Sequence, residues 1–158
     1  MQFKLYLAGG LFNAGERLHN LMLEKQLQRL GYDVILPQRE ALRFFDGKFF
    51  DVPGIVYDCR VSCENPEVIC VANVDGADSD SGTCVEYGIA TTANKRAIAY
   101  RTDFRTALAQ ELGWNAMLRG PETKQIYQPS FFTDLAEAES FYEELARQIH
   151  EAVLSLSV

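Results

Sequence analysis

The stretch VICVANVDGADSDSGTCVEYGIA, residues 68–90, decides the fold class of this chain. It begins with a near-continuous apolar run, residues 68–74, as expected for a strand of a parallel sheet that is covered on both faces. An acidic connection with glycines follows, and residues 83–93 then have the apolar spacing of a helix. A buried strand that leads through a short loop into a helix is the repeating unit of an α/β protein.

The rest of the chain continues this alternation. Segments with the apolar character of strands alternate with segments that have the period of helices. Strands are predicted at residues 3–9, 32–37, 67–74, 95–103 and 124–129, and helices at residues 14–30, 55–64, 83–93 and 132–156. Residues 38–53 have no clear period and are predicted as a loop, or a loop with a short helix. We therefore expect one domain, residues 1–158, with a three-layer α/β fold and an open parallel sheet of about five strands.

Charge and hydropathy exclude several classes of function. The chain has 158 residues, of which 47% are hydrophobic and 23% charged, and these values are typical of a globular protein. The formal net charge of -7 argues against nucleic acid as a partner, because a duplex-binding protein needs a basic face. No apolar run approaches the ~20 residues that span a bilayer, so no membrane partner is expected. The start MQFKLYLAGG lacks the pattern of a signal peptide.

The cysteines are expected to be reduced and packed in the protein. Cys59, Cys63, Cys70 and Cys84 form no C-x-x-C pair. Cys59 and Cys63 can share a helix face, but two thiolates alone make a poor zinc site. Because reduced cysteines are typical of cytosolic proteins, we expect a cytoplasmic location.

Glycine and polar residues gather where the predicted strands end. Gly9 and Gly10 follow the first strand, Gln38 follows the second, and the acidic stretch follows the third. In an open α/β sheet, ligands bind at the carboxyl ends of the strands, so a site is expected here. The glycine pair is neither a G-x-G-x-x-G nor a Walker motif, so the sequence predicts neither a dinucleotide site nor a P-loop.

The start of the helix after the third strand combines free N–H groups with a carboxylate. Residues 81–83 can offer backbone N–H groups to an oxyanion or a sugar hydroxyl. Glu86 lies one turn further, where the helix dipole favours the ionised carboxylate that a nucleophile needs. A plainer interpretation is that Asp78, Asp80 and Glu86 only complement this dipole. That interpretation explains less well why a glutamate occurs in the otherwise apolar sequence CVEYGIA.

Several motifs in this order carry a resemblance to a known family. YLAGGLFNAGER near the start, LPQ after the second strand, DSGTCVEYGIA in the middle, and then YRTDFR and NAM resemble the nucleoside 2-deoxyribosyltransferase family. The resemblance runs from about residue 4 to residue 117. It implies a flavodoxin-like (Rossmann-like) fold. It also implies cleavage of the N-glycosidic bond of 2'-deoxynucleosides and transfer of the sugar to another base.

The resemblance also implies roles for particular residues. Glu86 would be the nucleophile that forms a covalent deoxyribosyl-enzyme, and Tyr6 would hydrogen-bond and orient it. Asp80 would hold sugar hydroxyls. Gln38 could read a base edge through its amide. Asn115 would complete the sugar site of a neighbouring subunit, which implies a homo-oligomer.

Three residues are expected to bring backbone groups to the substrate. Gly9 lets the chain approach a ligand closely after the first strand, while Ser81 and Gly82 offer N–H groups at the helix start. The implied reaction needs no cofactor and no metal, although the aspartates of the acidic stretch are of the kind that binds Mg²⁺. The expected partners are a nucleoside or nucleotide and a nucleobase.

The group that protonates the leaving base is where this sequence departs from the family. Members commonly carry an aspartate on the helix before the third strand, where this chain reads VYDCRVSCENPEV. Asp58 is the predicted general acid, although strict spacing puts Cys59 or Arg60 at that position. Asp75 and Asp78 are the alternatives.

Two other functions stay open at this point. The loop of residues 38–53 is rich in arginine and phenylalanine, so Arg39 and Arg43 could meet a phosphate while the phenylalanines stack on a base. The chain would then be an N-glycoside hydrolase of (deoxy)nucleoside 5'-monophosphates. Ser79 and Ser81 would be further hydrogen-bond donors to the phosphate. A phosphoribohydrolase motif, P-G-G-x-G-T-x-x-E, is matched only at G-T-x-x-E. The remaining alternative is a non-catalytic nucleotide-binding module.

Overall fold

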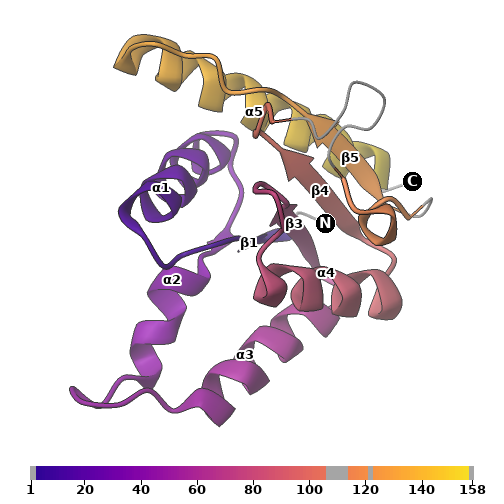
Figure 1. The fold of residues 1–158 in the computed structure, drawn as a ribbon. Coiled ribbons are helices and arrows are strands. Elements are labelled where there is room, and N and C mark those ends of the chain that lie inside the picture. The colour runs from indigo at the N-terminus through magenta and orange to yellow at the C-terminus, as the bar shows by residue number, and fades with distance from the viewer. Residues whose placement is uncertain (1–2, 106–113, 121–122, 157–158) are drawn as a thin grey trace.

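The computed structural model describes residues 3–105, 114–120 and 123–156, and within them the strands form one parallel sheet (Figure 1). The sheet has five strands in the order β2-β1-β3-β4-β5. These strands are β1 (Lys4–Ala8), β2 (Val34–Ile35), β3 (Val68–Asn73), β4 (Ala97–Arg101) and β5 (Lys124–Tyr127). The predicted α/β fold with a parallel sheet of about five strands is confirmed.

Helices cover both faces of this sheet, which gives three layers (Figure 1). One face is covered by α1 (Ala14–Arg29) and α5 (Leu135–Leu156), and the other by α3 (Val52–Glu64) and α4 (Ser81–Ala93). The chain leaves β1 toward β2 on one side and returns to β3 on the other. The order of the strands therefore reverses between β1 and β3, and the carboxyl ends of these two strands are where such folds bind ligands.

Alternation along β1 sends its side chains to opposite faces of the sheet. Leu5 and Leu7 belong to the core between the sheet and the helices α1 and α5. Tyr6 and Ala8 belong to the core between the sheet and the helices α3 and α4. Because successive side chains of a strand point to opposite faces, this register alone places Tyr6 on the side of α3 and α4.

The segment predicted as a loop, residues 38–53, contains more local structure than expected. It holds most of the short helix α2 (Pro37–Glu40), the 3₁₀ turn η1 (Ala41–Phe44) and an antiparallel bridge between Phe45 and Phe50. Helix α3 also begins three residues earlier than predicted. Its start is fixed by Asp51, whose side chain accepts a hydrogen bond of 3.1 Å from the Gly54 N–H.

All four cysteines are free thiols. Among the helices of the described residues, none has both the length and the apolar character needed to cross a membrane.

The packing of α5 on the sheet yields a prediction about stability. Leu145 is fully buried in the core, whereas Leu135 on the same helix is 88% exposed. We expect Leu145→Ala to lower the free energy of unfolding by about 2–5 kcal/mol, because it removes buried methyl groups and leaves a cavity. The matched substitution Leu135→Ala should change it by about 0.5 kcal/mol or less. Urea denaturation followed by circular dichroism measures both, and equal effects would contradict this description of the core.

Candidate active site

The carboxyl end of β1 opens into a cavity of about 380 Å³, here called the β1 cavity, bounded by α2, α3 and the start of α4. Most of its wall is apolar. Six of the residues predicted for the site line it: Tyr6, Gly9, Asp58, Asp80, Gly82 and Glu86.

Glu86 and Tyr6 are joined directly inside the β1 cavity. The Tyr6 hydroxyl donates a hydrogen bond of 2.6 Å to Glu86 Oε1. Tyr6 is only 2% exposed, and Glu86 is partly buried on α4. Burial raises the pKa of Glu86, the hydrogen bond from Tyr6 lowers it, and the charge of Asp80 raises it. Burial, and then the Glu86 charge, raise the pKa of Tyr6, so its hydroxyl stays protonated and serves as a donor.

Asp80 is the N-cap of α4. Its Oδ2 accepts hydrogen bonds from the Thr83 N–H at 2.8 Å and from Thr83 Oγ1 at 2.9 Å. These bonds give a partner to a backbone N–H at the start of the helix and hold the carboxylate at the edge of the cavity. A Cβ at Gly82 would lie 3.2 Å from Asp80 Oδ2, so glycine at this position keeps the space beside the carboxylate open.

Helix α3 brings Asp58 and Cys59 to the wall of the β1 cavity. Asp58 Oδ2 accepts a hydrogen bond of 3.1 Å from Arg43 Nη2, and Arg43 also pairs with Glu40 at 3.0 Å. Arg60 is exposed and pairs with Glu64 at 3.7 Å, outside the cavity lining. Of the two residues that strict spacing offered, Cys59 lines the cavity and Arg60 does not.

Three residues predicted for the site are not among those that line the β1 cavity. Gln38 is buried, and its amide accepts from Asn20 Nδ2 at 3.0 Å and donates to the Arg17 carbonyl at 3.2 Å. Ser81 is exposed at the start of α4. Asn115 caps the short 3₁₀ helix η2 (Ala116–Leu118) and is exposed.

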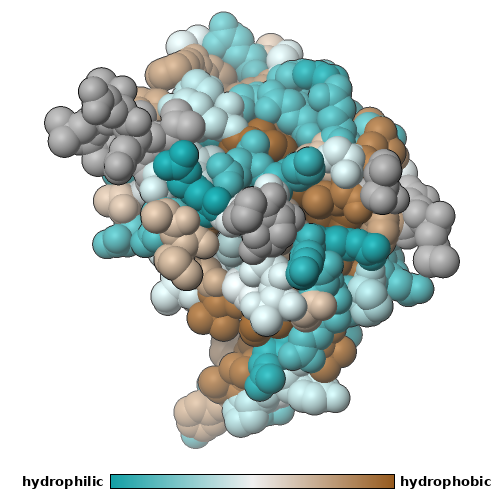
Figure 2. Space-filling model, turned by 90° about the vertical axis from the view of Figure 1, so that its right-hand side faces the viewer, coloured by the Kyte–Doolittle hydropathy of each residue, from teal (hydrophilic) through white to brown (hydrophobic). Residues whose placement is uncertain are grey.

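Aromatic residues around the β1 cavity include one that sequence reasoning missed. Phe44 and Phe50 come from the arginine- and phenylalanine-rich segment and line the wall, as does Phe12. Phe12 is 78% exposed, and its place two residues after the glycine pair is the signal that could have identified it. Figure 2 shows apolar residues gathered on the lower, projecting part of the molecule, which in Figure 1 is the region of α2 and α3.

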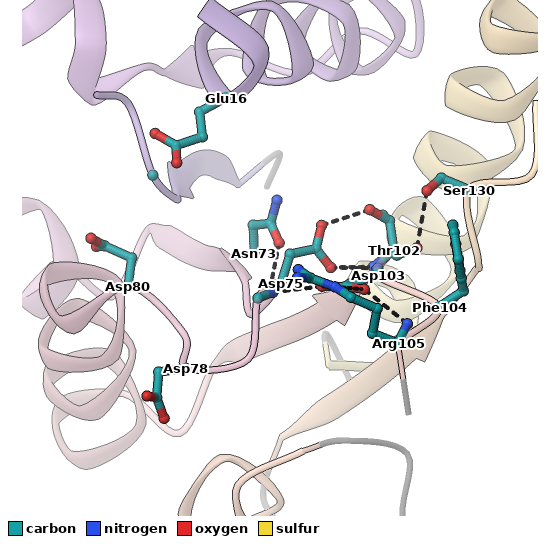
Figure 3. A pocket seen from close by; sticks show the side chains of 12 residues that line it. Glu16, Asn73, Asp75, Asp78, Asp80, Thr102, Asp103, Phe104, Arg105 and Ser130 are labelled. Carbon is teal, nitrogen blue, oxygen red and sulfur yellow. Dashed lines mark hydrogen bonds and ion pairs between the residues drawn. The ribbon is translucent and has the colours of Figure 1, made fainter. Parts of the chain in front are cut away.

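The acidic stretch after β3 mostly lines a different cavity, of about 640 Å³, shown in Figure 3. Asp75 accepts hydrogen bonds from the Thr102 N–H at 2.5 Å, Thr102 Oγ1 at 2.6 Å and the Asp103 N–H at 2.8 Å. Asp103 in turn pairs with Arg105, whose guanidinium holds the pKa of Asp103 well below its usual range. These bonds tie the end of β3 to the end of β4.

The alternative proton donors, Asp75 and Asp78, line the 640 Å³ cavity and not the cavity that contains Glu86. Asp80, by contrast, lines both cavities. Neither Asp75 nor Asp78 therefore shares a cavity with Glu86. Within residues 3–105, 114–120 and 123–156, no group of three or more His, Cys, Asp or Glu side chains is arranged to hold a metal ion.

Comparisons with solved structures agree with this fold. A conserved protein from Enterococcus faecalis V583 is 21% identical with a TM-score of 0.64, covering 92% of this chain and 99% of its own. A 2-deoxyribosyltransferase from Bacillus psychrosaccharolyticus is 20% identical with a TM-score of 0.55, covering 86% of this chain and 90% of its own. An oxidoreductase from Corynebacterium diphtheriae is 10% identical with a TM-score of 0.52, covering 98% of this chain and 99% of its own. At such identities the likeness shows the fold alone.

The family comparison is more specific than these likenesses. No curated protein matches the sequence significantly. The family model of the nucleoside 2-deoxyribosyltransferases matches residues 5–125, a range that includes all but the first residue of β1, the whole of α3 and α4, and every residue predicted for the site. The chain therefore belongs to the nucleoside 2-deoxyribosyltransferase family.

Proposed function

We propose that the chain cleaves the N-glycosidic bond of 2'-deoxynucleosides through Glu86 and transfers the deoxyribose to another base. The observation that carries this proposal is the 2.6 Å hydrogen bond from Tyr6 to Glu86 Oε1 inside a mostly apolar cavity. A carboxylate placed in such a cavity at an energetic cost, with a donor that orients it, is poised for nucleophilic attack. A non-catalytic nucleotide-binding module would have no need of this arrangement.

The reaction follows the double displacement of a retaining glycosidase. A Glu86 oxygen attacks the anomeric carbon while the bond from that carbon to the base nitrogen breaks, and a covalent glycosyl ester forms. The electron pair of the broken bond stays with the base, which takes up a proton. A nitrogen of the second base then attacks the same carbon, returns its N–H proton to the group that protonated the first base, and releases Glu86 as a carboxylate.

The surrounding residues fit the remaining tasks. Asp80, beside the open space at Gly82, is placed to accept hydrogen bonds from sugar hydroxyls. Asp58, which lines the cavity from α3, is the proposed proton donor to the leaving base. Phe44 offers an aromatic face on which a base can stack. Asn115, exposed on η2, is proposed to complete the sugar site of a second copy in a homo-oligomer.

Charge in the β1 cavity favours a nucleoside over a 5'-monophosphate. Its lining carries the acids Glu40, Asp58, Asp80 and Glu86, and the described residues contribute no lysine or arginine to that lining. A phosphate dianion in such a site meets like charges at short range, and this costs binding energy.

Three of the four groups proposed for a phosphate, Arg39, Arg43 and Ser79, are engaged elsewhere. Arg39 makes two hydrogen bonds to the buried Glu24 carboxylate, at 2.8 and 2.6 Å. Arg43 is paired with Glu40 and Asp58. Ser79 Oγ donates to the Val74 carbonyl at 3.2 Å. The hydrolase of 5'-monophosphates is therefore the less favoured of the two enzymatic alternatives.

The first prediction concerns the nucleophile. Glu86→Gln should abolish both base release and the deoxyribosyl adduct seen in the mass spectrum of the intact protein, because an amide cannot form the glycosyl ester. The matched control is Glu67→Gln, since Glu67 is exposed at the amino end of β3, the opposite edge of the sheet. Activity should persist in Glu67→Gln, and an active Glu86→Gln would refute the covalent mechanism. Adding an acceptor base distinguishes transfer from hydrolysis.

The second prediction concerns pH. Glu86 must be ionised to attack, and burial raises its pKa, so kcat/KM should fall on acidification at a higher pH than for an ordinary carboxyl. Tyr6→Phe removes a hydrogen bond that lowers this pKa, so it should move the acidic limb of the profile further upward. The measurement is kcat/KM against pH for both proteins. If the acidic limb of the kcat/KM profile lies at the same pH in Tyr6→Phe as in the wild type, the hydrogen bond from Tyr6 does not stabilise the carboxylate.

The third prediction concerns the substrate. A 2'-deoxynucleoside should be cleaved with a kcat/KM about tenfold or more above that of its 5'-monophosphate, a ratio that corresponds to about 1.4 kcal/mol of repulsion. Base release measured by chromatography at equal concentrations tests this. A preference for the monophosphate would instead support the hydrolase alternative.

A further inference from the structure

Thr83 is a buried polar residue in the wall of the β1 cavity. It lies in the first turn of α4, between the Asp80 cap and Glu86, and is only 1% exposed. Its hydroxyl donates a hydrogen bond of 2.9 Å to Asp80 Oδ2. No step of the proposed reaction uses this hydroxyl.

The bond from the Thr83 hydroxyl goes beyond what capping the helix requires. An N-cap carboxylate needs a backbone N–H of the first turn, and Asp80 already accepts one from Thr83 at 2.8 Å. A threonine hydroxyl within a helix commonly donates to a backbone carbonyl of the preceding turn. Thr91 and Thr92 of α4 follow this rule, because both donate to the Gly88 carbonyl, at 3.0 and 2.8 Å. The Thr83 hydroxyl donates to a carboxylate instead.

Both hydrogen bonds from Thr83 end on the same oxygen of Asp80, which is Oδ2. From the described part of the chain, no hydrogen bond reaches Oδ1 of Asp80. Threonine is β-branched, and this one is buried, so the direction of its hydroxyl is narrowly fixed. Two donors from one fixed residue restrict the rotation of the carboxylate and leave Oδ1 to accept a further hydrogen bond.

Asp75 shows the opposite arrangement. Its Oδ1 accepts from the N–H groups of Thr102 and Asp103, and its Oδ2 accepts from Thr102 Oγ1 (Figure 3). Both oxygens of Asp75 are thus used to join the ends of two strands. Asp80 keeps one oxygen for another partner, at the edge of the β1 cavity.

We propose that Thr83 is a positioning residue, whose hydroxyl orients the Asp80 carboxylate so that Oδ1 accepts a hydrogen bond from a hydroxyl of the deoxyribose. This inference rests on the proposed function and deepens it, since it states how the chain aims the acid that holds the sugar. A hydroxyl can orient the carboxylate without neutralising it, so the negative charge of Asp80 stays available to the substrate.

The first test removes the hydroxyl and keeps the backbone cap. Thr83→Val should lower kcat/KM for a 2'-deoxynucleoside about three- to tenfold, chiefly through a higher KM. Thr83→Ala should give a similar loss without placing a methyl group against the carboxylate. Thr83→Ser keeps the hydroxyl and should restore most of the activity. Wild-type kcat/KM in both Thr83→Val and Thr83→Ala, with folding verified by circular dichroism, would overturn the inference.

The matched control is Thr91→Val, in the same helix. It also removes a threonine hydroxyl, but that hydroxyl donates to the Gly88 carbonyl, and Thr91 is not among the residues that line the β1 cavity. Its kcat/KM should equal that of the wild type. An equal loss in Thr91→Val would assign the effect to the helix rather than to Asp80, against the inference.

The second test asks whether the loss depends on a hydroxyl of the sugar, which a merely structural role would not do. Isothermal titration calorimetry in a Glu86→Gln background measures the Kd of a 2'-deoxynucleoside and of its 2',3'-dideoxy and 2',5'-dideoxy analogues. Adding Thr83→Val should weaken binding of the parent about three- to tenfold. It should weaken binding much less for the analogue that lacks the hydroxyl held by Asp80. An equal effect on all three compounds would overturn the inference.

A further comparison separates action through Asp80 from direct contact with the substrate. In an Asp80→Ala background the carboxylate is absent, so adding Thr83→Val should not weaken binding of the 2'-deoxynucleoside further. A further loss in the double variant would mean that Thr83 contacts the sugar itself, and the positioning role would be wrong.

These measurements distinguish failure of the inference from failure of the proposed function. If the wild type releases base while Thr83→Val binds all three compounds as tightly as its parent does, the inference is overturned and the proposed function stands. If the expected binding pattern is seen but the wild type releases no base, the proposed reaction fails and the positioning of Asp80 stands. If the wild type neither binds nor cleaves deoxynucleosides, both fail.

Discussion

The hydrogen bond between the Tyr6 hydroxyl and Glu86 is the interaction on which the site depends. A carboxylate in an apolar wall is costly unless donors compensate for the lost water. Supplying the donor requires a strand that directs a tyrosine to the α3 and α4 side, and a helix that begins five residues before the glutamate. The register of β1 and the cap at Asp80 meet these two requirements.

The remaining acids divide into two groups with different physical roles. Asp75 and Asp103 bind backbone N–H groups and Arg105, and so hold the ends of β3 and β4 together at one wall of the larger cavity. Asp80 and Glu86 instead line the β1 cavity, where carboxylate oxygens can meet a sugar. The concentration of negative charge after β3 thus has a structural part and a part suited to binding.

Much of the fold was predictable because it rests on local patterns. The apolar run 68–74 and the helical spacing after it identified β3 and α4 to within two residues at each end. The structure beyond those patterns depends on long-range contacts. The bridge between Phe45 and Phe50 gives no periodic signal in the sequence. The hydrogen bond from Asn20 to Gln38 joins residues that are 18 positions apart. Cys59 and Asp58 are neighbours in sequence on α3, and both line the cavity that holds Glu86.

The walls of the β1 cavity have different origins along the chain. Tyr6, Asp80 and Glu86 come from β1 and the start of α4, whereas Phe44, Phe50 and Asp58 come from one continuous stretch between β2 and β3. Substitutions, insertions or deletions within that stretch can reshape the wall proposed to hold the base while the strand and helix that carry the nucleophile stay intact. The substrate range of this fold can therefore diverge through changes in one continuous stretch while β1 and α4 keep the nucleophile in place.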